Sequence, residues 1–188
     1  QAFVMKRRDW RHIKSAMEAA KPMVFIKYDE LDKDPFLLNT PEGTYDLRLG
    51  MSGRREHDAK DYLTKVTAVE PGDTGDAIWQ DCIQTIFLKD QELIRYVQEV
   101  VGLAAIGKVN GEALIIAYGD GRNGISTFWN TLAHVLGTYA GSIASDILTV
   151  NCRRNAAPEK AEMKGKRLII AAELEEGMRL NTSIVKQL

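Results

Sequence analysis

Residues 119–127 constrain the fold of this chain more than any other segment. The segment has glycine at positions 119, 121 and 124 and continues into Ile125, Ser126 and Thr127. It follows an apolar run at residues 113–118 and precedes a stretch in which Phe128, Leu132, Val135 and Leu136 recur at helical spacing. Short, fully apolar runs are typical of buried parallel strands. This order predicts a strand, a glycine-rich turn and a helix ending at Gly137.

The glycine-rich segment also carries a chemical signal. It matches the phosphate-binding pattern G-x-x-x-x-G-K-[S/T] except at Ile125, where the pattern has lysine. Glycines allow backbone N–H groups to surround an anion, and the positive end of the helix dipole favours phosphate. We predict a nucleoside triphosphate site made of Gly119, Asp120, Gly121, Arg122, Asn123, Gly124, Ile125, Ser126 and Thr127. The Ser126 hydroxyl is expected to bind Mg²⁺, and the alternative is a simple turn between a strand and a helix.

The absent lysine weakens this prediction in a definable way. A pair of unit charges about 4 Å apart is worth about 4 kcal/mol at an effective dielectric of about 20, so the loss of one cation beside the phosphates could lower affinity by orders of magnitude. Arg122, or a basic residue of 153–167, is a candidate substitute. An arginine elsewhere need not reach the same oxygens.

A second apolar run, residues 167–172, leads directly into acidic residues. Folds with a phosphate-binding loop use an acid at the end of such a strand to supply a carboxylate to magnesium and water. Glu173 is the first candidate for this catalytic and metal-binding role, and Glu175 is the second. The alternative is that both are solvated charges at the start of a helix.

The remaining apolar spacing and turn residues predict further elements. In chain order these are a helix over 1–20, a short strand near 23–28, a hairpin turning at 40–43 with its second strand near 45–49, helices over 77–88 and 90–101, and a strand within 143–150. Asp76 is expected to cap the helix over 77–88, whose apolar face would consist of Ile78, Trp79, Cys82, Ile83 and Ile86. The glycines at 107 and 111 mark a change from helical to βαβ pattern.

We therefore expect an α/β protein with two domains. Residues 1–106 would form a mostly helical α+β domain, and residues 107–188 would form an incomplete parallel sheet of the phosphate-loop type. The content of 45% hydrophobic and 27% charged residues in 188 is ordinary for a folded globular chain. The chain has neither a secretory signal pattern nor the roughly 18 apolar residues of a membrane span, so a cytosolic location is expected. Cys82 and Cys152 lack ligand-spaced neighbours, which argues against zinc.

The net charge of −1 conceals a patterned distribution. Residues 1–21 and 153–167 are basic, whereas residues 70–92 are acidic. Basic segments such as that containing Arg153 and Arg154 could line a path for DNA. Solvated surface is the alternative, because charge runs are usually exposed faces.

Short ordered motifs along nearly the whole chain carry a resemblance to a known family. They lie at residues 34–39, 43–48, 61–65, 119–124, 126–128, 136–140, 165–168, 173–177, 179–181 and 186–188. With these motifs the chain resembles the phage and plasmid primase-helicase family, whose motor is a superfamily-three helicase of AAA+ type. The first three motifs resemble its helicase-associated N-terminal domain.

The resemblance implies an ATP-driven ring, usually a hexamer, that moves on single-stranded DNA and unwinds duplex DNA during replication of a mobile element. It implies that Gly121, Asn123, Gly124, Ser126 and Thr127 hold ATP and Mg²⁺ and that Glu173 is the Walker B acid. A primase module in the same or another chain is also implied. Ile125 departs from the family's lysine.

The resemblance leaves several family elements without a counterpart. The family's DNA-contacting hairpin, sensor residue and arginine finger lie beyond Leu188, so we expect a fragment of a longer polypeptide or a sheet completed by a partner. Three functions stay open: a replicative helicase, a non-catalytic assembly or DNA-binding module derived from one, and a small-molecule kinase. No substrate lid or second basic motif favours the kinase.

Overall fold

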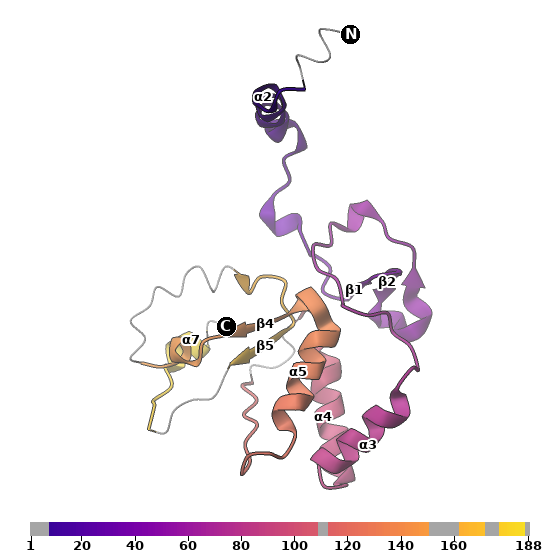
Figure 1. The fold of residues 1–188 in the computed structure, drawn as a ribbon, viewed down its shortest axis with the longest axis vertical. Coiled ribbons are helices and arrows are strands. Elements are labelled where there is room, and N and C mark those ends of the chain that lie inside the picture. The colour runs from indigo at the N-terminus through magenta and orange to yellow at the C-terminus, as the bar shows by residue number, and fades with distance from the viewer. Residues whose placement is uncertain (1–7, 109–112, 151–161, 172–176, 187–188) are drawn as a thin grey trace.

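The computed structural model describes residues 8–108, 113–150, 162–171 and 177–186. It combines helices with two small sheets, which is compatible with the predicted α/β class (Figure 1). The helices are α2 (Trp10–Ala20), α3 (Asp76–Ile86), α4 (Gln91–Ala104), α5 (Ile125–Leu136) and α7 (Thr182–Val185). The strands are β1 (Leu37–Thr40), β2 (Gly43–Asp46), β3 (Arg54–Arg55), β4 (Ala140–Ile143) and β5 (Leu168–Ala171). Within these residues we find no helix long and apolar enough to cross a membrane.

The predicted hairpin is confirmed, with a shorter second strand. Strands β1 and β2 pair antiparallel with Thr40 opposite Gly43, and the Thr40 hydroxyl donates to the Gly43 carbonyl at 2.8 Å. The second strand ends at Asp46, because the Asp46 carboxylate accepts the Arg48 N–H at 3.1 Å and caps a 3₁₀ segment, Leu47–Gly53. Strand β3 adds to the other edge of β2.

Helices α3, α4 and α5 share one apolar cluster. Its buried members are Ile83, Ile94 and Phe128, and the ring of Phe128 stacks on Trp79 with centroids 5.5 Å apart. A second cluster joins Leu38 and Tyr45 of the hairpin to Leu136, Tyr139 and Ala140. Both clusters therefore unite residues from either side of the predicted boundary between 106 and 107. The division into domains stays a prediction.

Helix α3 buries only part of the predicted apolar face. Trp79, Ile83 and Ile86 pack inward, whereas Ile78 is 73% exposed and Cys82 is also exposed. Successive helical residues are separated by about 100°, so five apolar residues in this spacing cover more than one face. Only the packing against α4 and α5 selects the buried one. The N-cap is Gly75, with Asp76 in the first turn.

The second sheet is a two-stranded parallel pair. Strand β5 lies where a strand was predicted. It pairs with β4 so that Leu168 lies opposite Ala140. The strand predicted within 143–150 is displaced toward the N-terminus, since Ser145–Leu148 is a 3₁₀ segment in which Ile147 and Leu148 are buried. Helix α5 precedes β4 and ends at Gly137, as predicted.

Two other strand predictions are wrong. Residues Lys21–Val24 form a 3₁₀ turn, and no strand follows before residue 28. Residues 113–119 have no secondary structure, and Leu114, Ile115 and Ile116 are 47%, 46% and 66% exposed. A parallel strand requires a hydrogen-bonded neighbour, and within the described residues β4 and β5 pair only with each other. The strand expected before the glycine-rich segment is therefore absent, and the phosphate-loop type of the sheet stays a prediction.

Candidate functional site

The glycine-rich segment lies at the N-terminal end of α5, beside the turn between α3 and α4 (Figure 1). Gly124 is the N-cap residue of α5 and has a φ of 82°. A Cβ atom placed there would lie 2.8 Å from Cγ1 of Ile86. Both the left-handed backbone and the close contact with α3 require glycine at this position.

Three residues of the loop have a left-handed backbone. Gly121 and Gly124 have φ of 82°, and Arg122, which carries a side chain, has φ of 53°. Left-handed residues in short succession change the direction of backbone N–H groups, and such turns form anion-binding concavities. Residues 119–123 are all exposed. The loop is therefore accessible to a ligand.

Asn123 closes the loop in the structure. Its Oδ1 atom accepts the Ile125 N–H at 3.2 Å, so it satisfies one of the free donors at the start of α5. Its Nδ2 atom lies 2.1 Å from the place that a Cβ atom at Gly119 would occupy. A phosphate bound at the Ile125 N–H would therefore have to replace the Asn123 side chain.

The last three residues of the segment 119–127 differ in their exposure to solvent. Ile125 is partly buried, and its Cδ1 atom lies 3.6 Å from the Cβ position of Gly119. Ser126 and Thr127 are exposed. The two hydroxyl groups, the glycine backbone and the helix N-terminus form a donor set that fits phosphate with an associated hard cation. The side chain at the lysine position is apolar and supplies no charge.

The predicted acids cannot be placed beside this loop. Glu173 and Glu175 lie outside the described residues, and strand β5 ends at Ala171. Among the described residues we find no group of three or more His, Cys, Asp or Glu side chains arranged for a metal ion. The catalytic and metal-binding roles of the two glutamates stay predictions.

Part of the basic segment 153–167 has a structural role. Lys164 donates to the carbonyl of Tyr28, and Lys166 donates to the carbonyl of Ala140 at 2.6 Å. Arg167 donates to the carbonyls of Ala105 and Leu37. Arg153, Arg154 and Lys160 lie outside the described residues. The three described cations therefore connect segments of the fold, a role that the run of charges alone did not reveal.

Burial shifts the pKa values of Arg167 and of its neighbour Tyr139. Burial lowers the pKa of the Arg167 guanidinium, and the Tyr139 hydroxyl opposes this effect. Burial also raises the pKa of Tyr139, whose hydroxyl accepts the Asn39 N–H at 3.0 Å. An arginine remains charged under such conditions, so the carbonyl oxygens that it binds hold a partly buried cation.

Comparison with known families finds a similarity over somewhat less than half of the chain. Residues 1–88 match the family model described as D5 N terminal like. This model describes the N-terminal domain of the phage and plasmid primase-helicase family, so residues 1–88 are similar to that domain. The matched region spans the hairpin, β3 and all of α3, and it contributes Ile83 to the cluster shared with α4 and α5. No curated protein matches the chain.

The family match is consistent with a helicase-related role in DNA replication of a phage-type element. It ends at Leu88, so the loop at 119–127 lies outside it. The matched region and the loop are nevertheless in contact, because Ile86 packs against Gly124.

Proposed function

We propose that this chain is part of an ATP-dependent replicative DNA helicase of a phage or plasmid type element. In this proposal it binds Mg-ATP at residues 119–127 and acts on single-stranded DNA. The observation that supports it most is the direct packing of a D5 N-terminal domain against a glycine-rich helix N-terminus with two exposed hydroxyl groups. The full-length protein would form a homo-oligomeric ring, a hexamer, and work with a primase module in the same or another chain.

The residues of the proposed site have separate roles. Backbone N–H groups of Gly121, Asn123 and Gly124 would hold phosphate oxygens, and Thr127 would add a hydroxyl donor. Ser126 and Glu173 would hold Mg²⁺, and Glu173 or Glu175 would orient water. ATP hydrolysis would supply the free energy for movement on DNA.

The second candidate function is a catalytically inactive assembly or DNA-binding module derived from such a helicase. The apolar, partly buried Ile125 and the Asn123 side chain bound to its N–H favour this candidate. Such a module would bind single-stranded DNA or assemble with equal strength in the presence and absence of ATP.

Titration calorimetry of Mg-ATP with the chain and its Ile125→Lys variant tests the site. We expect the lysine to tighten binding at least about tenfold, because it restores a cation beside the phosphates. Asn130→Lys, at an exposed position five residues further along the same helix, controls for a general increase in charge. Similar affinities for all three proteins would mean that another cation substitutes for the lysine. Absence of binding by all three would contradict the site.

Binding of a fluorescent single-stranded oligonucleotide then separates the two candidates. If Mg-ATP changes the affinity of the chain for DNA at least severalfold, the helicase proposal is supported, because a motor must couple its two ligands. DNA binding that is indifferent to ATP favours the inactive module.

A further inference from the structure

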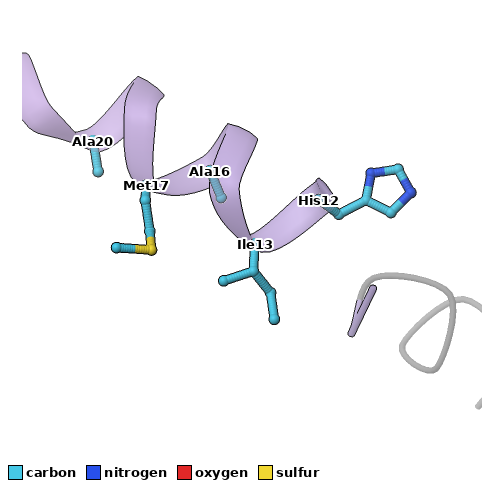
Figure 2. Close-up of a pocket in the computed structure, with 5 residues that line it drawn as sticks. All are labelled: His12, Ile13, Ala16, Met17 and Ala20. Carbon is cyan, nitrogen blue, oxygen red and sulfur yellow. The ribbon is translucent and has the colours of Figure 1, made fainter. Parts of the chain in front are cut away.

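Helix α2 presents an apolar face to solvent. The helix projects away from the two sheets and from the α3–α5 cluster (Figure 1). Figure 2 shows Ile13, Ala16, Met17 and Ala20 of this helix, which line a shallow hollow together with His12 and with no residue of another described element. Trp10 and Met17 are 67% and 56% exposed. Exposed apolar surface on this scale indicates a site for another molecule, since burial gains about 25 cal/mol per Å².

The surroundings of this face show what chemistry would cover it. Arg11 and Lys14 are exposed and form no ion pair within the described residues. The apolar surface continues past the helix, where Met23, Val24 and Phe25 are 85%, 77% and 75% exposed. A partner therefore needs an apolar stripe bordered by acidic side chains.

The outer face of α3 has this chemistry. Ile78 and Cys82 lie one turn apart and are exposed, opposite the buried Ile83. The exposed Asp81 lies beside them, and Asp76 and Asp73 precede them. None of these three carboxylates forms an ion pair within the described part of the chain. The charge of this face is complementary to that of α2.

The two faces are too far apart to meet within one molecule, because α2 and α3 lie at opposite ends of its longest axis (Figure 1). We infer that α2 of one copy docks on the outer face of α3 of a second copy. This interface is heterologous, so each copy has one donor face and one acceptor face, and repeated addition produces a ring or a filament. The inference does not depend on the nucleotide site.

The expected association is weak. An 11-residue helix covers less than the roughly 800 Å² per partner of a standard interface, so the complex should dissociate on dilution. It should also weaken with salt, because exposed charge pairs are screened over about 10 Å at an ionic strength of about 0.1 M.

Sedimentation equilibrium of the 188-residue chain under reducing conditions tests the inference. We expect concentration-dependent association, and we expect Met17→Glu and Ile78→Glu each to lower the association constant at least about tenfold. An equimolar mixture of these two variants should form a 1:1 complex and nothing larger, because one variant keeps a working α3 face and the other a working α2. Circular dichroism checks that both fold, as both positions are exposed.

A charge exchange makes the test independent of any loss of folding. Lys14→Glu and Asp81→Lys should each weaken association, and the double variant should restore it, whereas Lys108→Glu, also exposed, should have little effect. A wild-type chain that stays monomeric up to about 1 mM would overturn the inference, and so would a double variant no better than the single ones. Monomeric chain that binds anionic vesicles through Met17 would also overturn it and would assign α2 to a membrane surface.

Discussion

The guanidinium of Arg167 lies over the ring of Tyr139, with 4.3 Å between the Cζ atom and the ring centroid. The same guanidinium donates to the carbonyls of Ala105, at the end of α4, and of Leu37, in β1. The Arg167 N–H donates to the Tyr139 carbonyl at 2.7 Å. One residue immediately before β5 therefore joins the hairpin, the helical cluster and the parallel sheet.

Replacement of Arg167 should destabilise the whole chain. Arg167→Met removes the donors and leaves two carbonyl groups unsatisfied, so we expect a loss of about 2–4 kcal/mol in the free energy of unfolding. Urea denaturation measures this loss. Arg11→Met, which changes an exposed arginine on α2, is the control and should stay within about 0.5 kcal/mol of the wild type in dilute solution. Equal effects of the two changes would contradict the linking role.

Gly137→Ala should be strongly destabilising. Gly137 has a φ of 56°, and a Cβ atom there would lie 2.6 Å from the Ala68 nitrogen and 2.7 Å from the Val66 oxygen. The backbone strain and the contacts together should cost about 2–4 kcal/mol. Gly102→Ala is the matched control, because a Cβ atom at this position in α4 meets nothing within 4 Å. Thermal unfolding should show the control variant to be as stable as the wild type or up to about 1 kcal/mol more stable.

The charge of Asp46 should make stability depend on pH. The Arg48 guanidinium donates to Asp46 Oδ1 at 2.7 Å and holds the pKa of this carboxyl below its ordinary value of 3.8. A carboxyl with a lower pKa in the folded than in the unfolded chain stabilises the fold above the unfolded pKa, and this stabilisation disappears as pH falls through the folded pKa.

We therefore expect Asp46→Asn to lower Tm at pH 7 and to reduce the further fall of Tm below about pH 4. Asparagine still caps the 3₁₀ segment, so the comparison isolates the charge. Asp58→Asn changes another capping aspartate, one without an ion pair among the described residues, and serves as the control. A pH profile of Asp46→Asn parallel to that of the wild type would exclude the Arg48 contact as its cause.

Phe128 should link the stability of α5 to that of α3, which lies in the region matched by the family model. It is 3% exposed and contacts Trp79, Phe87 and Trp129. Phe128→Ala should cost about 3–5 kcal/mol and should lower the denaturation midpoint of α3 as well. Tyr118→Ala, 88% exposed, should be nearly neutral. If Trp79 fluorescence and helical content instead unfold in separate transitions, residues on either side of 107 are independent units.

The local elements of this chain could be predicted because their signals lie within a few residues of each other. The turn between Thr40 and Gly43 required a hairpin, Asp90 capped α4, and Gly137 ended α5. The glycine-rich turn and the strand before Glu173 could also be predicted from such local signals. Their nucleotide chemistry stays a prediction, because Glu173 lies outside the described residues and Ile125 supplies no charge.

The sequence by itself determined where α2, α3, α4, α5, the hairpin and β5 form, since capping, turn geometry and apolar spacing act over a few residues. Only the tertiary structure decided that Ile78 points outward, that Leu114 and Ile116 remain outside any strand, and that Arg167 binds carbonyl groups instead of facing solvent. These outcomes depend on partners distant along the chain, such as the 130 residues that separate Arg167 from Leu37. A local sequence pattern therefore does not predict a hydrogen bond such as that between Arg167 and Leu37.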